Sequence, residues 1–279
     1  MNPLRPSRPV PGPGPAMGST AGAPFRSSGT AESEPLRLLV VGSNGRMGRK
    51  LCTAIEAAKD LELAGSVDSD PDSWNAIDPR KVDAVVEFTH ASAIVGLASR
   101  LEALGKPWLS GTTGLDEQER HAIEHTAARV PVLWAANTSL GVALLRHWLR
   151  EAAELLPPDW ELEIVETHHT GKKDAPSGTA LALAEVYREV RGGKLMLGRG
   201  RESDPREAGE IGIQSLRLPG VVGEHRVHLS NGAESFELTH RAHDRVAFVL
   251  GALEAVRWLV GRPAGLYGLD DWAQDRLGN

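Results

Sequence analysis

The span from Glu163 to Leu183 combines residue types that can move protons and hold anions. It reads EIVETHHTGKKDAPSGTALAL and contains the adjacent pair His168 and His169. Histidine is the side chain whose unperturbed pKa lies near neutrality, so one member of this pair suits proton transfer. The span therefore indicates acid–base chemistry.

An anion site is indicated a few residues later. The first N–H groups of a helix are unpaired and carry partial positive charge, so those of Ser177, Gly178 and Thr179 suit a carboxylate. Lys172 and Lys173 would meet the same anion from a second side. The pattern favours an anionic ligand.

Simpler explanations exist for each part of this span. A histidine pair is more often a surface feature, lysine pairs are usually solvated, and a Pro-Ser-Gly-Thr turn is first of all a helix cap with Ser177 or Thr179 as the capping residue. All three nevertheless fall in one connection, between a strand that ends near Thr167 and a helix that follows Thr179. This coincidence favours function.

A glycine-rich turn follows the first apolar run. Its pattern, G-x-x-G-x-x-G, spans residues 42–48 and opens a helix, which suits a pyrophosphate at the helix N-terminus. Asp68, about 20 residues farther on, would accept hydrogen bonds from the ribose hydroxyls. The alternatives are a turn kept for packing and an exposed aspartate in the acidic run 68–72. The predicted cofactor-binding residues here are Gly42, Ser43, Asn44, Gly45, Arg46, Met47 and Asp68.

Two further strand ends carry polar turns, GTTG at 111–114 and AANTS at 135–139. Ligands bind at the carboxyl edge of an open parallel sheet, so both turns are candidates, although each is equally explained as a capped connection. The residues added to the cofactor prediction are Gly111, Thr112, Thr113, Ala135, Ala136, Asn137 and Thr138.

From residue 36 onward, short apolar runs alternate with helical stretches, which predicts an α/β fold with a Rossmann-like parallel sheet. The runs at 210–218, 221–229 and 235–240 instead alternate polar and apolar residues, which indicates an α+β domain with an open mixed or antiparallel sheet. We predict a nucleotide-binding domain at 36–138, a substrate-binding and oligomerisation domain at 139–244, and a C-terminal helix within 245–273, from about Arg245 to Val260, that packs back on the first domain.

Composition narrows the class of protein. Residues 1–35 are rich in proline and glycine and are predicted to be a disordered tail. A net charge of −6 argues against a general nucleic-acid binder, and 41% hydrophobic residues allow a sizeable core. The single cysteine, Cys52, and the lack of an apolar span favour the cytoplasm and no membrane association. The histidines lack ligand partners at metal-binding spacing, so no metal site is predicted.

With these motifs in view, the chain from Leu36 to its last helix resembles the dihydrodipicolinate reductase family, also called 4-hydroxy-tetrahydrodipicolinate reductase. The most specific segment is ETHHTGKKDAPSGT at 166–179. Supporting segments are VVGSNGRMGR at 40–49, GTTG at 111–114, AANTSLGV at 135–142 and VGEH at 222–225.

The resemblance implies hydride transfer from NADH or NADPH to a cyclic, conjugated imine dicarboxylate in diaminopimelate and lysine biosynthesis. By motif position it implies that His168 is the proton donor and acceptor and Lys172 the second catalytic donor, both cationic during turnover. The implied substrate contacts are His169, Gly178, Thr179 and Thr113. It also implies a homotetramer assembled through the second sheet, with which an uncovered apolar face of alternating strands is compatible.

Three positions depart from the commonest family pattern. Ser69 stands where many members carry an arginine for the 2′-phosphate of NADPH, which favours NADH, although Arg46 is still within reach of a phosphate. His90 and Thr138 replace a frequent arginine and a frequent aromatic residue. The competing hypotheses are a related Rossmann-type amino-acid or imine dehydrogenase and a catalytically silent NAD(P)-sensing module.

Overall fold

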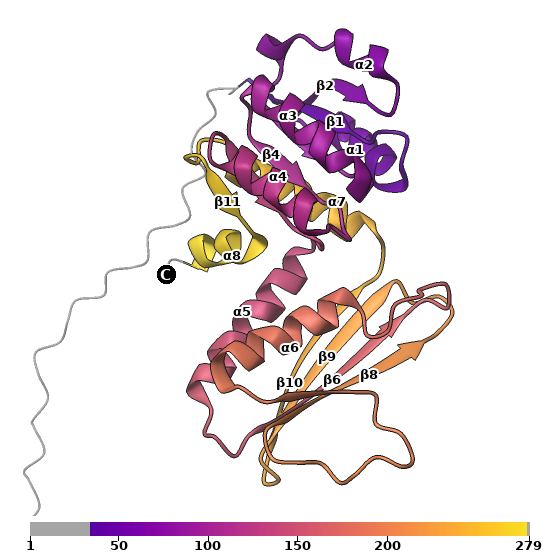
Figure 1. Ribbon diagram of the computed structural model, residues 1–279, viewed down its shortest axis with the longest axis vertical. Helices are drawn as coiled ribbons and strands as arrows, with labels where there is room; N and C mark the ends of the chain where they lie inside the picture. The colour runs from indigo at the N-terminus through magenta and orange to yellow at the C-terminus, as the bar shows by residue number, and fades with distance from the viewer. Residues whose placement is uncertain (1–33, 278–279) are drawn as a thin grey trace, which may run out of the picture. The chain divides into compact units, whose positions relative to one another are not determined.

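The apolar runs form the strands of two separate sheets, each packed against helices (Figure 1). The computed structural model describes residues 34–277, so the predicted tail lies outside the described residues except for Glu34 and Pro35. Within that range the fold confirms the predicted α/β class, with a Rossmann-like sheet followed by a mixed one.

The first sheet is parallel throughout and, in residues 34–277, has the order β11-β5-β4-β3-β1-β2. Its strands are β1 (Leu36–Val41), β2 (Leu61–Val67), β3 (Ala84–Glu87), β4 (Trp108–Ser110), β5 (Pro131–Trp134) and β11 (Gly265–Tyr267). The first five match the predicted apolar runs. The sequence did not predict β11, a three-residue strand that is only partly buried.

Helices cover both faces of this sheet because successive side chains of a strand point to opposite sides. The helices are α1 (Arg46–Ala57), α2 (Pro71–Asn75), α3 (Ile94–Leu104), α4 (Glu117–Ala127), α7 (Val246–Leu259) and α8 (Leu269–Leu277), with short 3₁₀ turns η1 (Pro79–Lys81) and η2 (Ala91–Ala93). Leu38 and Val40 belong to a core cluster with residues of α1, α7 and α8, whereas Leu39 and Val41 belong to a second cluster with residues of α3 and α4.

The predicted C-terminal helix is present from Val246 to Leu259, but it fills only part of the range 245–273. Helix α7 does pack back on the first sheet, where Val249 and Val256 are fully buried. It ends at Leu259, however, and the chain continues into β11 and α8. The glycine at 261, with a φ of +86°, follows the end of α7, because such a backbone angle cannot continue a helix.

The second sheet is mixed and, in the part of the chain described, has the order β10-β9-β6-β8-β7. Strands β10, β9 and β6 pair antiparallel, and β6, β8 and β7 pair parallel. Its elements are β6 (Glu161–His168), β7 (Lys194–Leu197), β8 (Glu210–Arg217), β9 (Gly223–Ser230) and β10 (Ser235–Ala242), with α5 (Leu140–Leu155) and α6 (Gly178–Arg191) on one face. Strand β7, short and half exposed, was not predicted.

The opposite face of the second sheet is less apolar than predicted. Glu224 forms ion pairs with Arg226 and Arg241, and Arg206 forms ion pairs with Glu161 and Glu163. The alternation of polar and apolar residues correctly indicated that one face of each strand is buried against the helices. It did not indicate that the other face would carry paired charges.

Candidate active site

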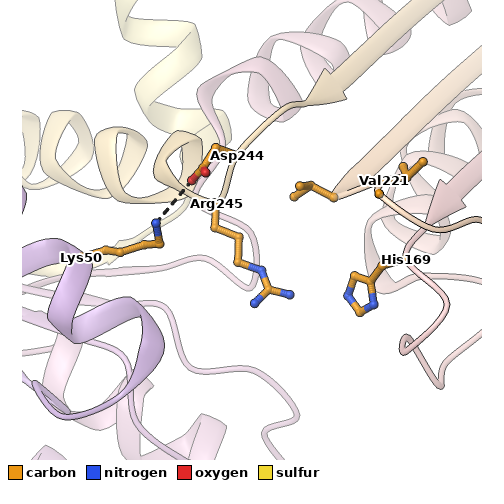
Figure 2. A pocket seen from close by; sticks show the side chains of 7 residues that line it. Lys50, His169, Val221, Asp244 and Arg245 are labelled. Carbon is orange, nitrogen blue, oxygen red and sulfur yellow. Dashed lines mark hydrogen bonds and ion pairs between the residues drawn. The ribbon is translucent and has the colours of Figure 1, made fainter.

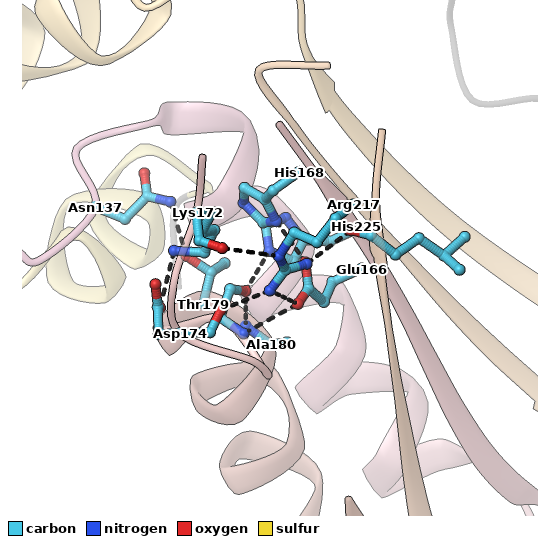
Figure 3. Close-up of polar contacts among 11 residues, drawn as sticks. Asn137, Glu166, His168, Lys172, Asp174, Thr179, Ala180, Arg217 and His225 are labelled. Atoms are coloured by element: carbon cyan, nitrogen blue, oxygen red, sulfur yellow. Dashed lines mark hydrogen bonds and ion pairs between the residues drawn. The ribbon is translucent and has the colours of Figure 1, made fainter. Parts of the chain in front are cut away.

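A buried carboxylate holds the first histidine of the pair. Glu166 is fully buried in β6, and its Oε2 lies 2.5 Å from Nδ1 of His168 at the end of the same strand (Figure 3). Arg217, on the neighbouring strand β8, donates to Oε2 at 3.0 Å and to Oε1 at 2.9 Å. Burial alone would raise the pKa of Glu166, but the hydrogen bonds from Arg217 and His168 hold it below its usual value.

The histidine itself is shifted towards its neutral form. Burial lowers the pKa of His168, and the positive charges of Lys172 and Arg217 lower it further, against the opposing effect of Glu166. Burial therefore favours the neutral imidazole, whereas the family resemblance implies a cationic His168 during turnover.

The lysine lies in the loop between β6 and α6. Lys172 Nζ is 2.8 Å from Asp174 Oδ2, and this hydrogen bond lowers the pKa of Asp174. Arg217 donates to the carbonyl oxygen of Asp174 at 2.5 Å and to that of Lys172 at 3.4 Å. One guanidinium thus links the buried carboxylate to the loop that carries the lysine. The neighbouring Lys173 is exposed.

The start of α6 is arranged as an anion site, with one difference from the prediction. Ser177 caps the helix, its hydroxyl accepting from Ala180 N–H at 3.1 Å, while its own N–H donates to Glu166 at 3.2 Å. That N–H is therefore already bonded to a protein carboxylate. The N–H groups of Gly178 and Thr179 have no acceptor among residues 34–277 and lie at the helix start, where a ligand carboxylate can bind.

Two further histidines lie beneath the helix starts and were not assigned a role from sequence. His225 Nε2 is 3.1 Å from the Ser177 hydroxyl, and His240 Nε2 is 3.1 Å from the hydroxyl of Ser139, which caps α5. Burial lowers the pKa of His225 to about 3 and also lowers that of His240. Strand pairing places three of these residues side by side across the sheet: Glu166, His225 and His240. This alignment could have identified the two histidines, but only once the register of the strands was known.

The dinucleotide turn has the geometry that a pyrophosphate requires. Asp68 follows β2 and accepts from the N–H groups of Asn44 and Ser69, both at 2.8 Å, which lowers its pKa. A side chain at Gly48 would lie 2.1 Å from the carbonyl oxygen of Gly42, so glycine is needed for this tight packing. Gly45 caps α1 without any side-chain bond, and the first turn of α1 carries no acidic residue, so the helix start is open to an anion.

The two other strand-end turns are also ordered by polar contacts. Thr112 is buried and donates to Glu87, whereas Thr113 is exposed at the carboxyl edge of the sheet. In the AANTS turn, the Asn137 amide donates to the Thr179 hydroxyl at 3.0 Å, and Thr138 donates to a carbonyl of α7. The bond from Asn137 brings a predicted cofactor residue into contact with a predicted substrate residue.

A cavity of about 360 Å³ lies between α1 and the loop after β6 (Figure 2). Its lining includes Lys50 from the helix that follows the dinucleotide turn, His169 from the histidine pair, and Arg245 next to the ion pair of Lys50 with Asp244. His168, Lys172 and Thr113 do not line it. The cavity therefore brings only the second histidine of the pair next to α1.

A metal centre requires a cluster of ligating side chains, and a membrane span requires a long apolar helix. Within residues 34–277, no group of three or more histidine, cysteine, aspartate or glutamate side chains is arranged to hold a metal ion. None of the helices in this range has the length and apolar content needed to cross a bilayer.

The sequence matches two family profiles that together span both sheets. The profile "Dihydrodipicolinate reductase, N-terminus" matches residues 36–138, and "Dihydrodipicolinate reductase, C-terminus" matches residues 141–272. Among proteins named 4-hydroxy-tetrahydrodipicolinate reductase, the one from Thermomicrobium roseum is 42% identical over 255 residues, covering 85% of this chain and 98% of that protein. The one from Caulobacter vibrioides is 38% identical over 250 residues, covering 86% and 97%.

A solved structure has the same fold. The dipicolinate-bound dihydrodipicolinate reductase from Paenisporosarcina sp. TG-14 superimposes with a TM-score of 0.69 at 23% identity, covering 85% of this chain and 99% of that chain.

Proposed function

Because the chain belongs to the dihydrodipicolinate reductase family of NAD(P)H-dependent oxidoreductases, we propose that His168 and Lys172 transfer protons during hydride transfer to a cyclic conjugated imine dicarboxylate. The product is tetrahydrodipicolinate, and the reaction belongs to diaminopimelate and lysine biosynthesis. The observation that carries the assignment of residues is the contact of His168 with a buried, ionised Glu166 beside the open N-terminus of α6.

The ligand's two carboxylates need two anion sites, and the chain has two groups of donors. The N–H groups of Gly178 and Thr179 with the Thr179 hydroxyl form one, and Lys172 with His169 forms the other. Thr113, exposed at the sheet edge, is proposed to contact both the ligand and the nicotinamide. The cavity beside His169 also contains Arg245, a cation in addition to the ion pair of Lys50 with Asp244, which supports an anionic group there.

Proton transfer follows from the charge balance of the reaction. The bound nicotinamide supplies a hydride, so the ring must also gain a proton to become the neutral reduced product. His168 Nε2 and the Lys172 ammonium are the groups of this site that can deliver one. A bound dicarboxylate adds negative charge beside His168, which favours its protonated form and so prepares the imidazole to donate.

The residues of the dinucleotide turn fit a nicotinamide cofactor. The turn from Gly42 to Gly45 and the first residues of α1, Arg46 and Met47, would hold the pyrophosphate. Asp68 would bind the ribose hydroxyls. The residues 111–113 and 135–138 would line the nicotinamide side. An ionised Asp68 next to an uncharged Ser69 repels a 2′-phosphate, so we expect NADH to be preferred.

The cofactor preference is tested by comparing kcat/KM for NADH and NADPH. We expect a ratio in favour of NADH for the wild-type chain and a shift towards NADPH in Ser69→Arg. A strong NADPH preference of the unmodified chain would refute this part of the proposal.

We also propose a cytoplasmic homotetramer assembled through the second sheet. The ion-paired face of that sheet supports an interface with a large polar component. Light scattering should give about four times the chain mass of 29.9 kDa. A monomer at micromolar concentration would contradict it.

The proposed reaction is tested by mixing the protein with NADH and freshly generated substrate and following nicotinamide absorbance. Turnover supports the reductase. A related imine or amino-acid dehydrogenase would oxidise NADH only with a different substrate, and a sensing module would bind NADH without turning it over.

A further inference from the structure

Glu166 has no role in the proton-transfer scheme, although it is the most tightly bonded group of the site. It is fully buried, and its neighbours across the sheet are His225 on β9 and Ser215 on β8. A buried carboxylate stays ionised only where cations and hydrogen-bond donors surround it. Here Arg217 binds both oxygens, and the N–H of Ser177 adds a third donor.

The ionised carboxylate determines which nitrogen of His168 carries the proton. A carboxylate only accepts hydrogen bonds, so the imidazole nitrogen 2.5 Å from it, Nδ1, must be the donor. The neutral ring is therefore protonated on Nδ1, and Nε2 is the nitrogen that gains and loses a proton. Nε2 lies over Gly223, where an added Cβ would be 3.0 Å away, so the missing side chain keeps that nitrogen uncovered.

We infer that Glu166 is a positioning residue, which fixes His168 as the Nδ1–H tautomer so that Nε2 exchanges the proton with the ligand, and that Arg217 orients this carboxylate. The inference rests on the proposed role of His168. To that role it adds Glu166, which orients the imidazole, and Arg217, which orients the carboxylate.

The charges around His168 give this arrangement a distinctive pH dependence. The groups that face it are Glu166 on its own strand, Arg217 on β8, the neutral His225 on β9 and Lys172 in the loop. Glu166 raises the pKa of His168, whereas Lys172 and Arg217 lower it. Removing the charge of Glu166 and removing that of Arg217 should therefore move this pKa in opposite directions.

The decisive variant is Glu166→Gln, which keeps the size of the side chain but replaces one oxygen by an amide donor. Arg217 takes the remaining oxygen, so the amide donates to Nδ1 and the ring proton moves to Nε2. We expect nitrogen-15 spectra of the histidine side chains to show this change of tautomer, with the His168 signal identified by its loss in His168→Gln among the ten histidines. We also expect kcat to fall at least about tenfold with little change in the KM of the dicarboxylate.

The matched control is Glu163→Gln. Glu163 lies on the same strand and also pairs with an arginine, Arg206, but on the opposite face of the sheet. The same chemical change there should leave the His168 tautomer and kcat as in the unmodified protein.

Arg217→Gln supplies the second, independent measurement. It removes a cation beside His168, so the pKa of His168 read from the pH profile of kcat/KM should rise, whereas in Glu166→Gln it should fall. A merely structural role would lower activity in both variants without opposite shifts. If Glu166→Gln fails to fold, the Arg217→Gln shift decides alone, and an unchanged or lowered pKa there overturns the inference.

The spectra separate this inference from the proposed function because they need no turnover. An Nδ1–H tautomer in the wild-type protein that reverses in Glu166→Gln supports the positioning role even if the protein fails to reduce the dicarboxylate. Wild-type turnover combined with an Nε2–H tautomer, or with an unchanged tautomer in Glu166→Gln, overturns the positioning role and leaves the reductase intact.

Discussion

Two glutamates of this protein are equally buried but bonded to opposite kinds of partner. Glu87 ends β3 of the first sheet and Glu166 lies near the end of β6 of the second, and neither exposes any surface. Glu87 accepts from the hydroxyls of Thr89, Thr112 and Ser110 and from the Thr89 N–H. Glu166 accepts from a guanidinium, an imidazole and one N–H.

The difference shows that burial alone does not give a carboxylate its role. Neutral donors from the ends of two strands surround Glu87, so it holds the turns after β3 and β4 together. Titratable donors surround Glu166, so its charge controls where a proton resides on His168. The first carboxylate is expected to affect stability and cofactor binding, and the second to affect proton transfer.

The largest effect is expected on the rate of hydride transfer, when a residue of the site around Glu166 is replaced. His168→Ala and Lys172→Ala should each lower the rate of hydride transfer by roughly two to four orders of magnitude while leaving NADH binding nearly intact. Stopped-flow absorbance and fluorescence titration measure the two quantities. Ser110→Ala, which removes a donor to Glu87, is the control and should stay within about tenfold of the wild-type rate. Near-normal turnover in both alanine variants would remove the assigned roles.

The stability of the protein in acid should depend on His225, which lies opposite Glu166 in the sheet. The unfolded chain protonates His225 below about pH 6.5, whereas the folded protein does so only near pH 3. The unfolded state therefore binds more protons in this range, and the free energy of unfolding should fall as the pH is lowered through it, by a few kcal/mol. Urea titrations from pH 7 to 4 should show a flatter dependence in His225→Gln. An identical slope in that variant would contradict the assignment.

Glu87→Gln tests the other half of the comparison. The amide nitrogen cannot accept the hydroxyl hydrogen bonds that Glu87 receives, so the buried donors lose a partner and stability should fall by about 1–3 kcal/mol. The KM for NADH should rise, because the turn after β4 loses its anchor, but the pH profile of turnover should not move. If Glu87→Gln lowered the pKa seen in the pH profile, as is expected for Glu166→Gln, the two carboxylates would act alike.

The smallest expected effect separates the two capping serines. Ser177→Ala and Ser139→Ala each remove a helix cap bonded to a histidine, buried His225 or half-buried His240, and should cost about 1 kcal/mol in thermal unfolding. Only Ser177→Ala should also raise the KM for the dicarboxylate, by a few-fold, because α6 carries Gly178 and Thr179. Equal kinetic effects in both variants would show that the start of α6 has no special part in binding.

Much of the fold could be predicted because most strands are either long enough to show a period or short and almost wholly apolar. The short strands β3, β4 and β5 are buried apolar runs, whereas β7 and β11, of the same length, are only partly buried and are recognisable only beside a partner strand. The C-terminal helix was predicted where it packs on the sheet. Its division from α8 depends on the short strand between them.

The site was predictable where residue type carries the information. His168, Lys172 and the start of α6 stand in one segment, so their chemistry could be read in order. Arg217 lies 51 residues from Glu166, and it meets that carboxylate only because β6 and β8 are paired in a particular register. The same applies to His225 and His240, whose alignment with Glu166 is a property of the sheet rather than of the sequence.

The order of the strands also limits how this chain can be divided. The first sheet is built from two distant stretches, since β11 pairs with β5 and α7 covers Leu109 and Leu133 after the chain has completed the second sheet. A gene fragment ending at residue 138 would encode five strands, with α1 as the remaining cover on the side that α7 and α8 shield in the full chain. Excised pieces or chimeras of this protein should therefore carry residues 246–277 together with 36–138, joined in a single polypeptide or supplied in trans.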